Sequence, residues 1–194
     1  TNVHWDFGGG EPASTNGADV AIDRINLTWS ASDSTTVKVG KFGNPFKTNP
    51  VFGEWTWDGD IQPAGVFGQW SSEGELDMDL RLGHFIIDEV NTLLLGDTAD
   101  PAVTSLQLNL AGGEDLKWGF STMVSDWSAE DFLVWDSVAS ATSGDFTGSV
   151  EFIQNLDDDS GEDTGMAIGF TYGTAGSQGD SRFFGSYFDF DKNA

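Results

Sequence analysis

Apolar and polar residues alternate with a period of two along much of this chain, and the alternation restricts it to β structure. In the clearest run, Leu76 to Leu82, apolar residues share one face while Asp77, Asp79 and Arg81 share the other. Successive side chains of a strand point to opposite faces, so such a run predicts a strand with one apolar and one polar face. About nine segments show this pattern, and none shows a long amphipathic helix. The other predicted strands lie near 19–30, 37–40, 64–70, 106–110, 116–121, 146–153, 166–172 and 182–190.

Turn signals separate several of these segments. Gly112-Gly113 predicts a hairpin turn, and Asp33-Ser34 predicts another. Residues 126–143 break the alternation, and we expect a long aromatic loop with one helical turn starting near Ser128. The length suits one domain, so residues 1–194 are expected to form a single β-barrel domain or a barrel fragment, with 1–17 a loop or an incomplete first strand.

Composition excludes several kinds of chemistry. The chain has no cysteine, which rules out disulfides and thiolate metal sites. Lys and Arg total 8 against 32 Asp and Glu, a formal net charge of -24, so nucleic acid is not an expected partner. No run of about 18 apolar residues occurs, and we therefore expect no transmembrane helix. The first residue is Thr1 rather than Met, which is typical of a mature or trimmed chain.

The alternation leaves the direction of the apolar face open. In a soluble sandwich or small barrel the apolar face is the core, whereas in an outer-membrane barrel it meets lipid. The predicted polar faces carry glycines and charges of both signs, and aromatics such as Trp29, Trp70 and Trp118 lie near strand ends, where interfacial girdles occur. These features favour the membrane barrel, and a secreted soluble β protein is the alternative.

Residues 37–70 carry a more specific signal. An alternating strand ends at Gly40-Lys41, Asn44-Pro45-Phe46 follows, and Trp57 to Gly65 reads Trp-Asp-Gly-Asp-Ile-Gln-Pro-Ala-Gly. This pattern resembles a porin family of Gram-negative bacterial outer-membrane β-barrels. The strand at 149–155, the acidic loop 157–163 and the glycine-flanked strand 165–173 resemble the family too, and the likeness extends over about 19–192.

The resemblance implies an antiparallel up-and-down transmembrane β-barrel, or a large part of one, in the bacterial outer membrane. Members of this porin family have more than nine strands, and their final strand usually ends in an aromatic residue. This chain instead ends Asp191-Lys-Asn-Ala194. Because bacterial barrels have even strand numbers, we expect either a fragment of a larger barrel or a small barrel with a different strand count.

The implied activity is passive diffusion of small solutes through a water-filled channel. Such a channel needs a polar lumen and a charged constriction and no catalytic centre, so we expect no enzyme activity and no cofactor. The expected partners are outer-membrane lipid and small ions or solutes, with a homo-oligomer also considered, and the net charge of -24 predicts a cation-preferring pore. By strand parity, the candidate pore-lining residues are Arg24, Lys38, Asp77, Asp79, Arg81, Gln107, Asn109, Lys117 and Glu151.

The connection between the predicted strands at 37–40 and 64–70 is a candidate constriction loop. Its candidate residues are Trp55, Trp57, Asp58 and Asp60. They could fold inward, but aspartates also commonly cap turns, so a loop that packs at the barrel rim is the favoured alternative.

Two further hypotheses about binding sites come from clusters of one residue type. Asp157, Asp159 and Asp163 form a Ca²⁺ candidate, although the spacing does not fit an EF-hand loop and a solvated turn is favoured. In the soluble alternative the protein would bind carbohydrate or serve a structural role. Its sugar-binding platform would consist of Trp55, Trp57, Trp127 and Trp135.

Overall fold

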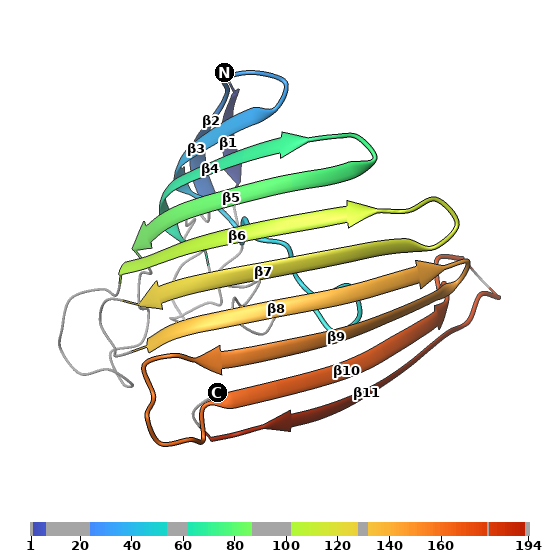
Figure 1. Ribbon diagram of the computed structural model, residues 1–194. Helices are drawn as coiled ribbons and strands as arrows, with labels where there is room; N and C mark the ends of the chain where they lie inside the picture. Colours follow the sequence, from blue (N-terminus) through green and yellow to red (C-terminus); the bar gives the residue numbers. More distant parts are fainter. Residues whose placement is uncertain are drawn as a thin grey trace, which may run out of the picture.

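All the described strands belong to a single antiparallel up-and-down sheet (Figure 1). The computed structural model describes residues 2–6, 24–53, 62–86, 102–127, 132–177 and 179–192. Each strand pairs with its neighbours in the sequence, which confirms the all-β, up-and-down fold. The strands are β1 (Asn2–Asp6), β2 (Arg24–Ser30), β3 (Thr35–Lys41), β4 (Ala64–Ser72), β5 (Leu76–Ile86), β6 (Ala102–Gly112), β7 (Lys117–Trp127), β8 (Phe132–Ser143), β9 (Phe146–Asn155), β10 (Thr164–Gly173) and β11 (Arg182–Phe190).

Short turns join most of the strands at one end of the sheet, and longer connections join most of them at the other. At the first end, here called the turn end, the connections span 31–34, 73–75, 113–116, 144–145 and the longer 174–181. At the opposite end, the loop end, 42–63 joins β3 to β4 and 87–101 joins β5 to β6. Both predicted hairpin turns are confirmed. Gly113 has φ 90°, a conformation that costs glycine little.

Residues 132–143 are a strand, so the predicted long aromatic loop over 126–143 is wrong, whereas the helical turn expected to start near Ser128 lies outside the described residues. β7 continues to Trp127, and β8 pairs with β7 and β9 along its length. The alternation fails here because small or polar residues lie on the outward face and Val134 and Val138 point to the other side. Outward Ser137 instead has its Oγ 2.8 Å from Thr122 Oγ1, and the Trp135 indole donates to Thr122 Oγ1 at 2.9 Å.

The two faces of the sheet have the opposite polarity to those of a soluble protein. Outward apolar side chains are exposed, for example Leu82 at 54% and Leu106 at 48%. Polar side chains on the other face are buried, with Gln107 and Glu151 each only 2% exposed. Directly paired residues of neighbouring strands share a face, so this division extends across the sheet as a continuous outward band of apolar residues.

Aromatic side chains follow the turn end of the outward face. They lie within about three residues of the turns and on the same side of the sheet as the apolar band. All are exposed. They are Trp29, Trp70, Trp118, Phe146, Tyr172 and Phe183.

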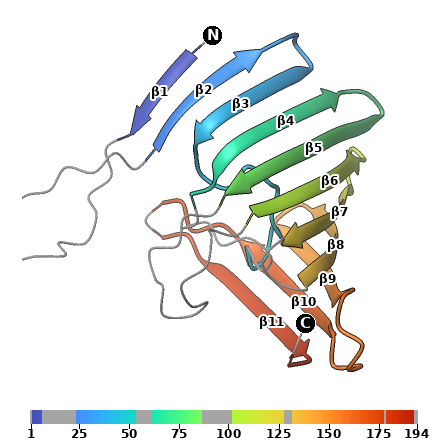
Figure 2. The ribbon, with the colours of Figure 1, turned by 90° about the vertical axis from the view of Figure 1, so that its left-hand side faces the viewer.

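The sheet curls (Figure 2), and the buried polar side chains, such as those of Gln107 and Glu151, lie on its concave side. β1 and β11 are the two edges of the sheet order. Every neighbouring pair is antiparallel, so β1 and β11 point in the same direction. A wall that is antiparallel throughout would therefore need an odd number of further strands between these edges.

We expect Gly144 to determine the β8–β9 hairpin. Gly144 has φ 55° at the first position of the two-residue turn Gly144-Asp145, and an L side chain there costs about 1–2 kcal/mol. Gly144→Val should lower the free energy of unfolding in urea by about that amount, whereas Gly144→Asn should cost less because asparagine tolerates this region. Equal stability of the two variants would contradict this assignment of the turn.

Candidate functional site

Residues 42–53, here called the strap, leave the end of β3 and cross the concave face of the sheet. They form the first part of the connection predicted to hold a constriction, whereas Trp55, Trp57, Asp58 and Asp60 lie outside the described residues. Asparagine side chains shape the strap: Asn44 Oδ1 accepts from Phe46 N and Asn49 Oδ1 accepts from Val51 N, each at 2.9 Å. Each is an Asx turn with a proline as its middle residue, so the strap contains two similar turns five residues apart.

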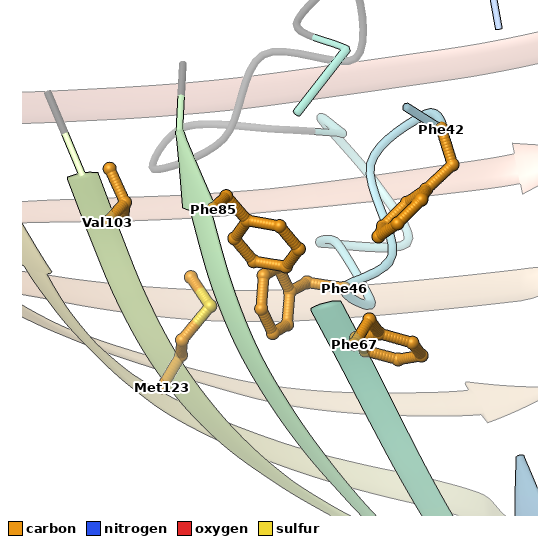
Figure 3. Packing of buried hydrophobic residues seen from close by; sticks show 6 residues of the cluster. All are labelled: Phe42, Phe46, Phe67, Phe85, Val103 and Met123. Atoms are coloured by element: carbon orange, nitrogen blue, oxygen red, sulfur yellow. The ribbon is translucent and has the colours of Figure 1, made fainter. Parts of the chain in front are cut away.

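An aromatic cluster holds the start of the strap against the sheet (Figure 3). Phe46 packs edge-to-face on Phe67 of β4 at 6.1 Å between ring centroids and on Phe85 of β5 at 6.0 Å. Phe42 makes similar contacts with both rings. Val103 and Met123 complete the cluster, and Trp127 packs against it. This is a hydrophobic core of ordinary kind, placed on the otherwise polar face where the strap covers it.

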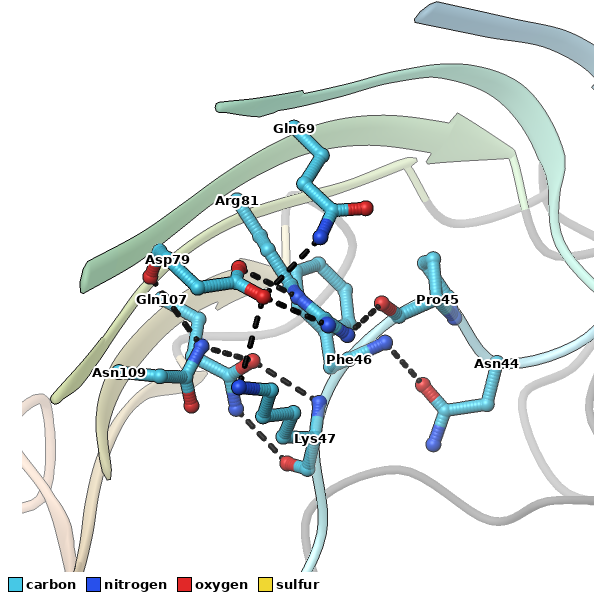
Figure 4. A network of polar contacts seen from close by, with 9 residues as sticks. All are labelled: Asn44, Pro45, Phe46, Lys47, Gln69, Asp79, Arg81, Gln107 and Asn109. Atoms are coloured by element: carbon cyan, nitrogen blue, oxygen red, sulfur yellow. Dashed lines mark hydrogen bonds and ion pairs between the residues drawn. The ribbon is translucent and has the colours of Figure 1, made fainter. Parts of the chain in front are cut away.

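Polar contacts fix the middle of the strap (Figure 4). The Gln107 amide pairs with the Lys47 backbone in both directions: Oε1 accepts from Lys47 N at 2.9 Å and Nε2 donates to Lys47 O at 2.7 Å. Arg81 Nη1 donates to the Pro45 carbonyl at 2.6 Å. A glutamine amide has the same donor and acceptor as a peptide, so Gln107 binds the strap as a neighbouring strand would.

Asp79 organises the charges beneath the strap. It accepts from Arg81 Nε at 2.8 Å and Nη2 at 3.0 Å, a two-point contact that fixes the guanidinium geometry. Gln69 Nε2 donates to Asp79 at 3.0 Å, and the Lys47 ammonium lies 3.4 Å from it. Asp79 and Arg81 are two residues apart on one strand and hence on one face, so the alternation of β5 itself brings them together.

The tip of the strap, residues 49–52, contacts the opposite wall of the curled sheet. Asn49 Nδ2 donates to the Glu151 carboxylate of β9 at 2.6 Å, and Ser149 Oγ donates to Asn49 Oδ1 at 2.9 Å. Phe52 packs edge-to-face on Phe188 of β11 at 5.5 Å. The strap therefore connects β4–β6 with β9–β11 across the concave side, and it narrows the space enclosed there.

Glycine at position 169 makes room for the tip. A Cβ atom at Gly169 would lie 2.3 Å from the Phe52 ring and 3.0 Å from Val51. Real Cβ atoms do not approach other atoms this closely, so a larger residue would have to displace the Phe52 and Val51 side chains from β10.

All nine candidate pore-lining residues lie on the concave face. Strand register places Asp77, Asp79 and Arg81 of β5 beside Ala111, Asn109 and Gln107 of β6. Lys38 lies with its Nζ 5.9 Å from the Phe67 ring centroid, close enough for a cation–π contact. Arg24, Lys117 and Glu151 occupy the same face of β2, β7 and β9. That these residues line a pore stays a prediction.

The remaining sequence candidates are not brought together. Trp127 lies on the concave face and Trp135 on the convex face, so these two do not share a sugar platform. His84 is also convex, with its Nδ1 2.9 Å from Thr104 Oγ1. The Asp163 carboxylate accepts from Gln154 Nε2 at 2.9 Å. Among the described residues, no group of three or more His, Asp or Glu side chains could hold a metal ion.

Sequence reasoning missed the residues that hold the tip, namely Asn49, Ser149 and Gly169. The repeated Asn-Pro at 44–45 and 49–50 is the signal that could have predicted the strap turns. Nothing local could have paired Asn49 with residues about one hundred positions later in the chain.

Comparison with known proteins identifies no family for this chain. No family model matches the sequence, and no curated protein matches it. A solved structure titled OmpTdeltaL8, a loop L8 deletion mutant of OmpT, an outer membrane protein of Vibrio cholerae, overlaps at a TM-score of 0.47 with 11% identity. The overlap covers 89% of this chain and 76% of that one. At this level the likeness carries no argument about this protein, so the assignment below rests on geometry. The described residues include no helix able to cross a membrane.

We expect Gly169→Leu to release the tip of the strap. The chain has no native cysteine, so a single cysteine introduced by Val51→Cys reports on the tip by its rate of maleimide labelling. Because leucine cannot fit beneath Phe52, labelling should become several-fold faster in the Gly169→Leu background. Gly68→Leu is the matched control, since a Cβ there meets nothing within 4 Å. Equal labelling rates in the two backgrounds would show that the tip does not rest on Gly169.

Proposed function

We propose that this chain forms part of the wall, and the constriction, of a water-filled channel in a bacterial outer membrane. Small solutes would diffuse passively through this channel. The observation that carries the proposal is the inverted polarity of the sheet. Soluble monomers rarely expose apolar patches larger than a few hundred Å², yet here the outward face is apolar across β2 to β11 while polar side chains are buried inside. A sheet of this polarity is suited to lipid outside and water inside.

Three further features support a membrane barrel. The exposed aromatics at the turn end, including Trp29, Trp70 and Trp118, occupy the position of an interfacial girdle. The longest connections, 42–63 and 87–101, lie at one end and most turns at the other end are short, a division that is usual for outer-membrane barrels. The strap supplies a narrowed section lined by Arg81, Lys47 and Asp79, which is what a diffusion channel uses to select solutes. Additional strands between β11 and β1 would complete the wall, and homo-oligomer formation is a separate prediction.

We propose that the pore prefers cations, and that the acidic rims rather than the wall cause the preference. Among the concave-face residues of β2–β11 and the strap, six are basic and four acidic, so the net charge of these residues does not account for a cation preference. The basic residues are Arg24, Lys38, Lys47, Arg81, Lys117 and Arg182, and the acidic ones are Asp77, Asp79, Asp136 and Glu151. The chain has 32 acidic residues in all, and turns such as 157–163 hold many of them. Acidic mouths raise the local concentration of cations.

The lipid-facing assignment predicts that charge is tolerated poorly on the convex face. Leu106→Lys, in the middle of the apolar band, should lower the free energy of unfolding from lipid vesicles by about 2–4 kcal/mol. Leu116→Lys is the matched control, because Leu116 is exposed in a turn beyond the band and should cost about 0–1 kcal/mol. Urea unfolding of the vesicle-inserted chain measures both values. If both variants stay within about 0.5 kcal/mol of the parent, as for ordinary surface changes in water, the face does not meet lipid.

If the acidic rims cause the cation preference of the pore, that preference should depend on salt concentration. The Debye length falls from about 10 Å at 0.1 M to about 3 Å at 1 M, so reversal potentials in planar bilayers should indicate cation preference at low salt and little preference at high salt. The triple variant Asp157→Asn, Asp159→Asn, Glu162→Gln should reduce the low-salt preference while the chain still conducts. Anion preference at low salt, or a preference independent of salt, would rule out this explanation, and absence of conductance would rule out a channel formed by this chain alone.

A further inference from the structure

Two buried acidic side chains lie on the wall that the tip of the strap contacts. Glu151 of β9 is 2% exposed and Asp136 of β8 is 9% exposed. Strand register pairs Val138 with Glu151 and Asp136 with Ile153, so the two acids are diagonal neighbours on the concave face. The Cα atoms of such neighbours are about 7–8 Å apart, and the two carboxyl groups interact electrostatically. This acidic pair is separate from the Asp79 network.

Glu151 has little compensation for a negative charge. Among the described residues, its one hydrogen-bond donor is Asn49 Nδ2, at 2.6 Å. This amide is neutral, and a single neutral donor does not replace the hydration of an ionised carboxylate. The Asn49 oxygen is used elsewhere, because Oδ1 accepts from Ser149 Oγ and from Val51 N, each at 2.9 Å. Glu151 therefore depends on the tip for its hydrogen-bond donor.

No basic side chain of the described residues faces the two acids. β8, β9 and β10 contain no lysine or arginine. Lys117 of β7 lies at the turn end, whereas the β7 residue opposite Asp136 is Met123. Lys47 of the strap forms its ion pair with Asp79. Within the described residues of β7–β10 and the strap, the two acids are the titratable groups on the concave side apart from these two lysines.

Ionising both acids beneath the closed tip would place two like charges together with little water. Like charges at short range repel each other, and the repulsion is stronger where water is excluded. Lifting the tip lets water reach the pair, which screens the repulsion and restores the hydration of the carboxylates. The closed arrangement therefore retains a proton on the pair that the open arrangement releases.

The tip can leave the wall while the rest of the strap stays in place. The start and middle of the strap are held by the aromatic cluster and by the polar contacts to β5 and β6. The tip is a compact unit, because the backbones of Asn49 and Gly53 exchange hydrogen bonds at 2.9 and 3.0 Å. Beside the contacts of Asn49, it rests on Phe188 of β11 and over Gly169 of β10.

We propose that the tip of the strap is a proton-dependent latch. It is closed over Glu151 and Asp136 while the pair holds a proton, and it is released when both carboxyl groups ionise. Because the closed state binds more protons than the open state, raising the pH shifts the balance toward release. The latch itself does not require a channel, but its effect on conductance rests on the proposed function.

Maleimide labelling of the full chain carrying Val51→Cys, refolded in detergent micelles, measures release of the tip. At each pH the rate is compared with that of the same chain unfolded in urea, which cancels the pH dependence of the thiol itself. The ratio of the unfolded to the folded rate is the protection of the tip. Protection should fall between about pH 5 and about pH 8, by up to about tenfold for each pH unit, the change expected when opening releases one proton. Protection that is constant or rises with pH would overturn the latch.

Three variants, each in the Val51→Cys chain, connect the pH dependence to the acidic pair. Glu151→Gln keeps an acceptor for Asn49 Nδ2 and removes the titration, so its protection should be independent of pH. Asp136→Asn removes the repulsion and should reduce the pH dependence. Asp145→Asn is the matched control, because it removes an acidic charge in the β8–β9 turn and should leave the pH dependence unchanged. If Glu151→Gln does not refold, equal pH dependence of Asp136→Asn and Asp145→Asn still contradicts the latch.

Bilayer recordings separate the latch from the channel. Release of the tip widens the narrowed section, so the conductance should rise with pH in the parent chain and stay constant in Glu151→Gln. If the chain conducts and the protection of the tip is independent of pH, the latch is wrong and the channel stands. If the protection falls with pH but the chain does not conduct, a channel formed by this chain alone is wrong and the latch stands.

Discussion

The structure depends on the need of every strand to satisfy its backbone hydrogen bonds through its neighbours in a continuous ladder. In the proposed membrane setting, a strand whose outward side chains are apolar finds no replacement partner for its backbone in lipid, which agrees with the unbroken pairing from β1 to β11. The regular antiparallel order follows, because hairpins give each strand an adjacent partner with little loop-closure entropy. Within the sheet order, β1 and β11 are the strands that keep a row of unpaired backbone groups. Because they point in the same direction, an antiparallel segment that closes the wall between them must contain an odd number of strands.

The concave side shows how a sheet with a polar inner face still supports a folded connection. The strap brings its own apolar residues, Phe42 and Phe46, which pack on Phe67 and Phe85 and exclude water locally. Its backbone polar groups are then met by side chains, most directly by the Gln107 amide. A buried connection is stable only when both requirements are met, since an unpaired backbone group inside would offset the gain from the aromatic contacts.

The same arrangement links the strap to the proposed channel. Asp79 holds Arg81 and Lys47 together beneath the strap. The acidic rims and the strap thus contribute to the proposed channel in different ways. Rim charge acts at long range and is screened by salt, whereas the strap acts through direct contacts.

The sequence by itself determined the strands, their two-sided character and most of the residues of each face, because the period of two follows from the geometry of a single strand. It did not predict β8, where outward Ser137 and inward Val134 and Val138 blur the contrast between faces. Tertiary structure alone decided which face points outward, because the same alternation suits a soluble core and a lipid surface equally well. It also decided where the strap ends, since Asn49 meets Glu151 and Ser149, and Phe52 meets Gly169, only when the curled sheet brings its opposite walls close together.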